Sequence, residues 1–341
     1  MLAARSRGAI RALQRRCGAN VNEFGLIARY FTRPVSDGFV RVGIGDDAAV
    51  VALAPGHELA VSVDMLVEGR HFLPDVDPEA LGHKTLAVNL SDLAAVGARP
   101  RWALLAGALP DADERWLAAF TRGLFALADR FGVSLIGGDT TRGPRNLCLT
   151  IMGELPAGTA ITRSGAAAGD DVWVSGTLGD AMLALAALQG RTPLPPAELS
   201  RLRARLERPE PRVPLGEALR GIATAALDVS DGLTGDLAHI LEASHVGARI
   251  EVAAVPCSDV MRAKIDGDRA LALQCLLAGG DDYELCFTAA PSDRGRVAAA
   301  GARCDVAVTR IGTITTDAGL HLVDERGERV ALPRAFDHFA A

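Results

Sequence analysis

Hydrophobic and polar positions alternate along this chain with two different periods, one typical of strands and one typical of helices. Across residues 57–64 the two kinds of side chain alternate, which predicts a strand with Leu59, Val61 and Val63 on one face. Residues 78–96 have the apolar spacing of a helix. The same reasoning predicts helices at residues 22–31, 111–131, 179–188, 233–244 and 271–277, strands at 133–136, 147–152, 172–175, 225–227, 249–255 and 283–288, and a hairpin at 320–332.

This mixture of elements predicts a two-lobed fold of the α/β or α+β class. A chain of 341 residues is too long for one ordinary core. Glycine and alanine dominate residues 156–169, which places a boundary there, between an N-terminal domain at 21–155 and a C-terminal domain at 156–341. Residues 1–20, basic and rich in alanine, are expected to be a disordered leader, and residues 189–214 a surface excursion.

Composition narrows the possible functions. Hydrophobic residues make up 49% and charged residues 23% of the chain, as in ordinary globular proteins. The net charge of −6 argues against a nucleic-acid binder, and no apolar run is long enough to cross a membrane. Six scattered cysteines without a Cys-x-x-Cys pair indicate free thiols in a reducing compartment, so we expect a cytoplasmic protein. Lys84 and Lys264 are the only lysines, which leaves arginine or Mg²⁺ to meet a phosphate-rich ligand.

Aspartate stands beside glycine or serine at the end of an apolar segment six times. The six stretches are Gly45-Asp46-Asp47, Ser62-Val63-Asp64, Asn89-Leu90-Ser91-Asp92, Gly138-Asp139, Asp228-Val229-Ser230-Asp231-Gly232 and Gly279-Gly280-Asp281-Asp282. Carboxylates and hydroxyls are hard donors that suit Mg²⁺, so the set points to metal ions bridging a polyphosphate during phosphoryl transfer. A stretch of this kind by itself is more often a turn or a helix N-cap than a ligand site, and spacing does not show whether the six meet in space.

Four further residues are candidates with an ordinary structural alternative. Asp92 shares a helix face with Asn89, which is compatible with a site or with an exposed polar stripe. His71 fits a packed loop histidine as well as a ligand, and Arg163 fits a surface arginine as well as a phosphate clamp. Phe336, near the C-terminus, fits a core residue or one that docks the tail of the chain. The chain lacks the P-loop, the dinucleotide-binding glycine motif and the protein-kinase motifs, so it is not a common kind of kinase.

Taken in order, the motifs resemble one family. These are Gly43-Ile44-Gly45-Asp46-Asp47, Ser62-Val63-Asp64 followed by His71-Phe72, the segment from Lys84 to Gly97, Gly137-Gly138-Asp139-Thr140, Asp228 to Gly232 and Gly279 to Leu285. Together they resemble the thiamine-monophosphate kinases over roughly residues 22–339. The resemblance implies the fold shared with aminoimidazole ribonucleotide synthetase: an N-terminal sheet that pairs with its copy in a homodimer, a C-terminal α/β lobe, and ATP in the cleft between the lobes.

The same resemblance implies an activity and a site. The activity is Mg²⁺-dependent transfer of the ATP γ-phosphoryl to thiamine monophosphate, the last step of thiamine diphosphate synthesis, by direct in-line attack with several Mg²⁺ ions and no dedicated base. ATP would contact Gly138, Asp139, Arg163 and Ser230, and thiamine monophosphate would contact His71, Asp281 and Phe336. The implied metal ligands are Asp47, Ser62, Val63, Asp64, Asp92, Asp139, Asp228 and Asp231.

Two residues depart from the family pattern, and alternatives remain. Asp281 stands where the family usually has glutamate, and Val63 where it often has threonine, so Val63 offers only its backbone carbonyl. Aminoimidazole ribonucleotide synthetase, selenophosphate synthetase and the hydrogenase-maturation dehydratase share the implied fold. Cys17 lacks the context of the reactive residue in selenophosphate synthetase, and the chain does not end in a cysteine as the dehydratase does. A non-catalytic nucleotide-binding protein is the alternative from a different class.

Overall fold

The computed structural model describes residues 23–35 and 37–333, so the predicted leader at 1–20 and the candidate Phe336 lie outside the described residues. The chain divides into two compact units. Of the described residues, the first unit comprises those up to Asn89 and Pro100–Ala157, and the second comprises Leu90–Arg99 and those from Gly158 onward. The short segment from Leu90 to Arg99, which includes the end of one helix, therefore groups with the residues after 157.

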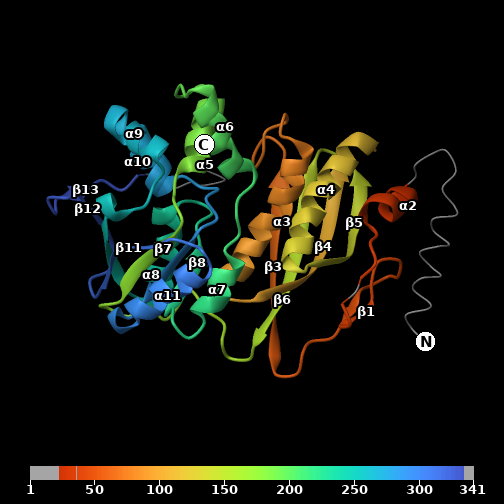
Figure 1. The fold of residues 1–341 in the computed structure, drawn as a ribbon, viewed down its shortest axis with the longest axis horizontal. Helices are drawn as coiled ribbons and strands as arrows, with labels where there is room; N and C mark the ends of the chain where they lie inside the picture. Colours follow the sequence, from red (N-terminus) through yellow and green to blue (C-terminus); the bar gives the residue numbers. More distant parts are fainter. Residues whose placement is uncertain (1–22, 36, 334–341) are drawn as a thin grey trace. The chain divides into compact units, whose positions relative to one another are not determined.

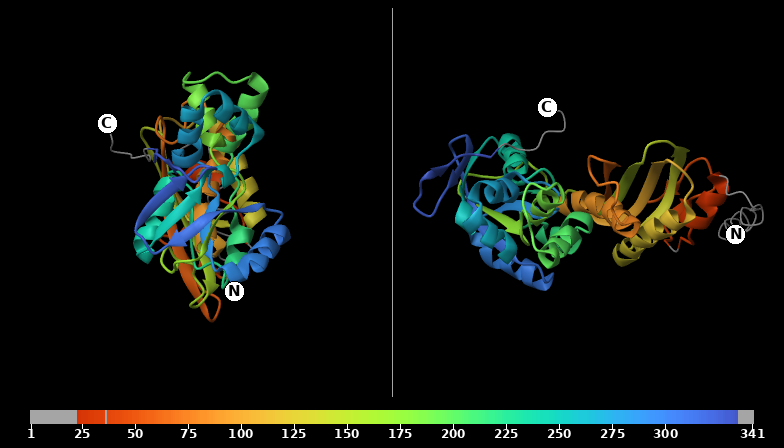
Figure 2. Two further views of the ribbon diagram at one scale, coloured as in Figure 1. Left: turned by 90° about the vertical axis from the view of Figure 1, so that its left-hand side faces the viewer. Right: turned by 90° about the horizontal axis from the view of Figure 1, so that it is seen from above.

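The first unit is built on a four-stranded sheet with the strand order β3-β6-β4-β5. Its elements are α2 (Glu23–Leu26), η1 (Ile27–Phe31, a π-helical turn), β1 (Val40–Val42), β2 (Val50–Val51), β3 (His57–Val67), α3 (Pro78–Ala95), β4 (Arg99–Leu109), α4 (Glu114–Phe131), β5 (Ser134–Arg142) and β6 (Asn146–Pro156). β3 and β6 are antiparallel, β4 and β5 are parallel, and β1 forms a small hairpin with β2. Figures 1 and 2 show α3 and α4 covering one face of the sheet.

Two glycines let α3 and α4 approach each other closely. A Cβ atom at Gly82 would overlap the carbonyl of Phe120, and one at Gly123 would overlap the carbonyl of Glu79. Contact at this distance is open only to residues without a side chain. Asp113 caps α4 by accepting from two backbone N–H groups, and Gly132 ends the helix at a φ of 68°. The predicted bounds of both helices are confirmed to within a few residues.

The second unit contains a seven-stranded sheet with the order β13-β12-β9-β11-β7-β10-β8. Its strands are β7 (Asp171–Ser175), β8 (Ala225–Asp228), β9 (Gly247–Glu251), β10 (Leu285–Ala289), β11 (Val308–Thr315), β12 (Gly319–Val323) and β13 (Arg329–Val330). Its helices are α5 (Asp180–Leu188), α6 (Pro196–Glu207), α7 (Val213–Leu219), α8 (Leu233–Ser244), α9 (Asp259–Gly267), α10 (Arg269–Ala278) and α11 (Arg294–Arg303). The 3₁₀ turns are η2 (Val252–Ala254) and η3 (Pro291–Asp293). Buried side chains of β7, β8 and β10 form one core with those of α5, α8 and α10.

Several predictions about elements are wrong in detail. The strand that was predicted to end at residue 136 continues to Arg142, because Gly137 and Gly138 pair in register with Leu104 and Leu105 of β4; the irregularity in the pairing falls at Ile136. The expected surface excursion contains α6, whose Leu202 and Leu206 are buried. The predicted hairpin at the end of the chain is confirmed, with Gly327 in its turn at a φ of 80°.

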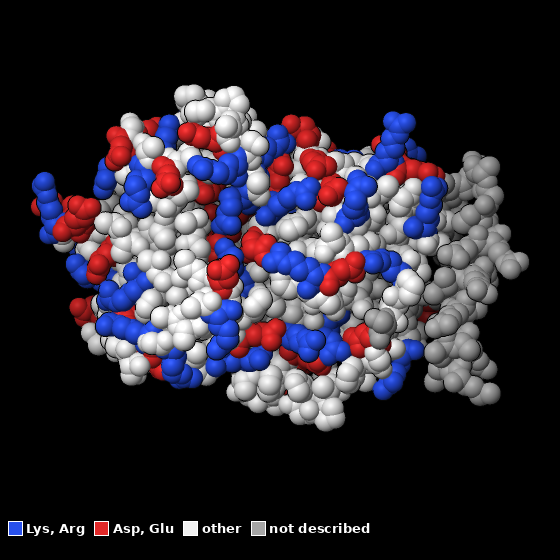
Figure 3. All heavy atoms as spheres, in the orientation of Figure 1, with Lys and Arg blue, Asp and Glu red and all other residues white. Residues whose placement is uncertain are grey.

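The alternation predicted for β3 is confirmed, but its apolar face is exposed. The side chains of Leu59, Val61, Val63 and Met65 are 43%, 57%, 58% and 51% exposed. Elsewhere on the surface, Figure 3 shows basic and acidic side chains interspersed over the face that it draws. Among the described residues, no helix is both long enough and apolar enough to cross a membrane.

Candidate functional site

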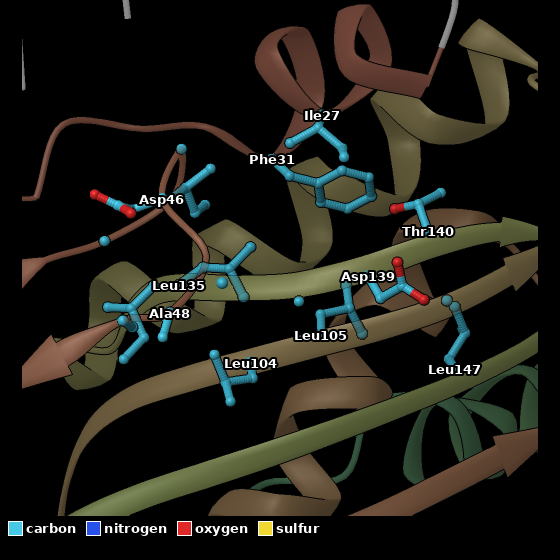
Figure 4. Close-up of a pocket in the computed structure, with 18 of the residues that line it drawn as sticks. Ile27, Phe31, Asp46, Ala48, Leu104, Leu105, Leu135, Asp139, Thr140 and Leu147 are labelled. Carbon is cyan, nitrogen blue, oxygen red and sulfur yellow. The ribbon is translucent and has the colours of Figure 1, made fainter. Parts of the chain in front are cut away.

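One large cavity lies in the first unit, with a volume of about 980 Å³. Its apolar wall includes Phe31 of η1, Leu104 and Leu105 of β4, and Trp116 of α4. Its polar groups come from the loop between β1 and β2 and from β5, with Asp46, Asp47 and Asp139 as the charged residues. Figure 4 shows Asp46 and Asp139 with Leu104 and Leu105 around this space. No lysine, arginine or histidine is among the described residues that line it.

Hydrogen bonds fix the loop between β1 and β2 and the segment that precedes β1. Gly45 adopts a φ of 109°, and Asp46 accepts a hydrogen bond of 3.0 Å from the N–H of Asp47. Before β1, both carboxylate oxygens of Asp37 accept from the Arg101 guanidinium at 3.0 Å, and Trp102 Nε1 donates at 2.9 Å. Burial alone would raise the pKa of Asp37, but these hydrogen bonds and that of the Phe39 N–H hold it below its ordinary value.

Gly138 brings the backbone of β5 against β4 at the cavity wall. Its φ is 148°, and a Cβ atom there would overlap the carbonyl of Leu105. A residue with a side chain therefore does not fit at this position. The next residue, Asp139, is exposed and lines the cavity. The structure thus brings three sequence candidates, Asp47, Gly138 and Asp139, to one cavity.

A second group of candidates lies on β3 and the loop that follows it. Ser62 and Asp64 are half-buried on one face of the strand, whereas Val63 is exposed on the other face. The N–H of Asp64 donates to Asn89 Oδ1 at 3.1 Å. Asn89 itself is 1% exposed, so the reading of Asn89 as part of an exposed polar stripe is wrong.

His71 is oriented by its own turn. The N–H of Val67 donates to His71 Nδ1 at 3.1 Å, and Lys84 Nζ donates to the His71 carbonyl at 3.2 Å. Because Nδ1 accepts, the neutral ring carries its proton on Nε2. His71 can then act as a hydrogen-bond donor through that atom.

In the second unit, the end of β8 and the loop before β10 meet. Asp228 is paired with Leu285, and the N–H of Asp281 donates to the carbonyl of Ser230 at 2.8 Å. The structure therefore brings together Asp228, Ser230, Asp231 and Asp281, which sequence spacing alone does not show.

A single buried carboxylate shapes the turn after β8. Asp236 accepts from the N–H groups of Ser230, Asp231 and Gly232, each at 3.0 Å. Burial raises the pKa of Asp236 to about 7, and the three donors oppose that rise because they favour the carboxylate.

Two further candidates, Arg163 and Asp92, lie on other elements. Arg163 lies in the loop before β7, where Ser244 Oγ donates to its carbonyl and accepts from the N–H groups of Gly165 and Ala166, each at 3.2 Å. Asp92 is half-buried on α3, among the helix residues that group with the second unit.

The donors suit Mg²⁺ in chemistry, although they are not gathered as a closed metal centre. Among the described residues, no three aspartate, glutamate, histidine or cysteine side chains lie close enough to hold an ion together. Asp46, Asp47 and Asp139 nevertheless supply hard oxygen atoms to one cavity that has no cationic side chain among its described lining residues. Oxygen atoms of this kind are donors that a divalent cation accepts.

Several residues of the sites were not predicted from the sequence. Trp116 and Phe120 line the cavity but follow the ordinary apolar spacing of α4, which gives no functional signal. Ser244 is the last residue of α8 and, as an ordinary polar residue there, gives no functional signal in the sequence. Asp46 and Asn89 belong to motifs that the sequence analysis recognised. Their position inside those motifs could have indicated that they belong to the sites.

Two family models and several known proteins match this chain. The protein-family model for the AIR synthase related protein, N-terminal domain, matches residues 45–155, and the family model for the corresponding C-terminal domain matches residues 167–325. The thiamine-monophosphate kinase of Escherichia coli (strain K12) is 48% identical over 322 residues, which are 93% of this chain and 98% of that protein.

Two solved structures are similar over nearly the whole chain. The thiamine-monophosphate kinase from Stenotrophomonas maltophilia K279a is 44% identical, with a TM-score of 0.80 and coverage of 96% of this chain and 97% of that one. AaThiL complexed with AMPPCP and TMP is 30% identical, with a TM-score of 0.74 and coverage of 95% and 100%. These matches and the mixed sheets and helices confirm the expected α/β (α+β) fold class. The chain belongs to the thiamine-monophosphate kinase family, whose two domains are those of the AIR synthase related proteins.

Proposed function

We propose that this protein phosphorylates thiamine monophosphate with ATP in the presence of Mg²⁺, giving thiamine diphosphate and ADP. The observation that carries the proposal is the cavity of the first unit, where apolar side chains adjoin three carboxylates and the glycine backbone of β5. An apolar wall suits a nucleoside base, and carboxylates suit metal-bound phosphates. The relative solved with AMPPCP and TMP supports this choice of substrates.

Each unit has aspartates that would hold Mg²⁺. In the first unit these are Asp47, Asp64 and Asp139, with the hydroxyl of Ser62 and the carbonyl of Val63. In the second they are Asp92, Asp228 and Asp231. When bound, the ions supply positive charge that offsets repulsion between the phosphates. The carboxylates hold and orient that charge, while Gly138 lets phosphate approach the backbone and Arg163 and Ser230 contact ATP.

Thiamine monophosphate would be held by His71 and Asp281, with Phe336 beside the thiamine rings. The Nε2 proton of neutral His71 is a donor suited to a phosphate oxygen. The attacking phosphate is already ionised at neutral pH, so the protein needs to orient it in line rather than deprotonate it. We therefore propose direct transfer without a phosphorylated enzyme.

We further propose that two copies pair through β3. β3 is the end strand of its sheet and carries four apolar side chains that are more than two-fifths exposed. A long apolar edge strand is a strong template for pairing with another chain. A second copy supplies a matching edge, since the same surface then faces itself across a two-fold axis. We also propose that the protein works in the cytoplasm.

The test of the activity is product analysis with purified protein, ATP, Mg²⁺ and thiamine monophosphate. Thiamine diphosphate and ADP in equal amounts are expected, and chelation of the metal should stop their formation. ATP binding without any thiamine diphosphate would contradict the proposal and favour a non-catalytic nucleotide-binding protein. ATP made chiral with oxygen isotopes at the γ-phosphorus tests the route. A single in-line transfer inverts that centre, whereas retention would indicate a phosphorylated enzyme.

A further inference from the structure

The loop between α10 and β10 holds two residues in a backbone conformation that side chains disfavour. Asp281 has a φ of 67° and Tyr283 a φ of 52°. Aspartate tolerates this left-handed region, but a bulky residue such as tyrosine rarely adopts it. Such a conformation persists only where the surroundings enforce it, and it tends to occur at functional sites. The surroundings of this loop therefore show what fixes the position of Asp281.

Backbone and side-chain contacts hold the loop from two directions. The N–H groups of Asp281 and Tyr283 donate to the carbonyls of Ser230 and Val229, each at 2.8 Å. On the buried side, both carboxylate oxygens of Asp282 accept from the N–H of Gly179, at 2.9 and 2.8 Å. Alternate residues of the loop thus contact the interior. The direction in which the Asp281 side chain points therefore depends on those inner contacts.

Glu284 is the most strongly held of these inner side chains. It is fully buried, and its carboxylate accepts from Ser175 Oγ at 2.6 Å. Arg212 donates to both of its oxygens at 2.6 Å, and Arg205 donates to Oε1 at 2.9 Å. A Cβ atom at Gly176 would overlap this carboxylate, so the space is fitted to it. A buried carboxylate with two guanidinium partners strongly restrains the backbone that carries it.

We propose that Glu284 is a positioning residue for recognition of thiamine monophosphate. Its ion pairs with Arg205 and Arg212 tie the loop to α6 and to the start of α7. The tie keeps Tyr283 in its left-handed conformation and so fixes the carboxylate of Asp281, two residues before it. Glu284 contacts no substrate in this scheme. The inference rests on the proposed function, because it assumes that Asp281 binds thiamine monophosphate.

The test is steady-state kinetics of Glu284→Gln, which keeps the size of the side chain and removes its charge. We expect kcat/KM for thiamine monophosphate to fall about ten- to a hundredfold, because a small displacement of a binding group has effects of that order. The loss should lie mainly in the KM for thiamine monophosphate, with the KM for ATP changed less than about twofold. In a double-mutant cycle with Asp281→Asn, the two losses should not add, because one acts through the other.

Asp171→Asn is the matched control. Asp171 is also a buried carboxylate held by two arginines, Arg294 and Arg310. It lies at the start of β7, and these partners come from α11 and β11 and not from the loop between α10 and β10. This variant should lose stability and keep kcat/KM for thiamine monophosphate. If Glu284→Gln does not fold, Arg205→Gln removes one of the two arginine partners of Glu284, together with a bond of 3.4 Å to the Thr177 carbonyl. This variant should show the same selective rise in the KM for thiamine monophosphate, but a smaller one.

Two outcomes would overturn the inference. In the first, the wild type is active and Glu284→Gln or Arg205→Gln lowers thermal stability but leaves the kinetics unchanged. The other is a cycle in which the losses of the two single variants simply add. A wild-type protein that forms no thiamine diphosphate would instead overturn the proposed function, and this inference with it.

Discussion

Gly138 is the residue whose replacement the structure restricts most directly at the cavity. A side chain there would overlap the Leu105 carbonyl, and its φ of 148° is nearly closed to other residues. We expect Gly138→Ala to lower the free energy of unfolding by about 3 kcal/mol or more, the size typical of severe backbone conflicts. Gly132→Ala is the control, because nothing lies within contact distance there and only its φ of 68° opposes a side chain, at about 1–2 kcal/mol. Urea unfolding of both variants measures the difference, and equal losses would contradict the close approach.

Replacing Asp139 should change activity and not stability, because its side chain is exposed at the cavity. If Asp139 holds Mg²⁺, Asp139→Asn should raise the Mg²⁺ concentration for half-maximal rate by about tenfold or more, a size common for changes at metal centres. Its melting temperature should stay at the wild-type value. Asp266→Asn, an exposed aspartate on α9, should leave the Mg²⁺ dependence unchanged. A normal Mg²⁺ dependence of Asp139→Asn would remove this residue from the metal site.

At this scale, sequence reasoning located acidic motifs but not their neighbours in space. Asp47 and Asp139 are more than ninety positions apart, and only the folded sheet places both at one cavity. The sequence also did not reveal the partners of Glu284. Its partners Arg205 and Arg212 come from a segment whose prolines and arginines indicate surface, and nothing in their spacing reveals a shared buried carboxylate.

Among the elements, β7 depends on one ion-pair cluster at its first residue. Asp171 accepts from Arg294 of α11 and from Arg310 of β11, and its side chain is 1% exposed. Hydrogen bonds from Arg294 and then Arg310 outweigh burial and hold the pKa of Asp171 below its ordinary value of 3.8. We expect Asp171→Asn to lower the free energy of unfolding at neutral pH by about 2 kcal/mol, a figure reduced for the partial exposure of both arginines.

The pH dependence of that loss has a definite sign. A carboxyl group with a lowered pKa in the folded state stabilises the protein above its unfolded pKa of about 3.8, and the effect disappears as pH falls through the folded value. The difference in stability between wild type and Asp171→Asn should therefore be constant above about pH 5 and shrink below pH 3.8. Unfolding curves across this range test the point. A difference that grew on acidification would mean that Asp171 is not stabilised as a carboxylate.

Long periodic elements were predictable, whereas elements decided by tertiary pairing were not. α3 and α4 carry clear apolar spacing with proline, aspartate and glycine at their ends, so their bounds could be predicted closely. β5 passes through Gly137 and Gly138 because β4 pairs with it, which no local signal contains. α9 and α11 were missed because short, polar and glycine-bearing helices resemble loops in sequence.

For the whole molecule, the apolar face of β3 predicts the state of association. Leu59, Val61, Val63 and Met65 would face water along the end strand of a sheet if the protein were a monomer. Burying a fully exposed side chain of this kind contributes about 1.5–3 kcal/mol, and these side chains are about half exposed, so each would contribute roughly 1 kcal/mol to an interface. The sequence predicted this alternation, but it could not distinguish a face turned to the core from one turned to a second copy, because both are apolar.

Val61→Lys tests this interface, since it places a charge in the middle of the row on both copies. Burying two like charges without partners is costly, so we expect the dissociation constant of the dimer to rise at least about a hundredfold. Sedimentation velocity over a range of concentrations should then show a monomer where the wild type is a dimer. Leu332→Lys is the control, because Leu332 is 52% exposed but follows β13 at the other sheet, so its replacement should leave the dimer intact. If Val61→Lys sediments as the wild type does, β3 is not the interface; if both variants dissociate, the association depends on general surface hydrophobicity and not on this edge.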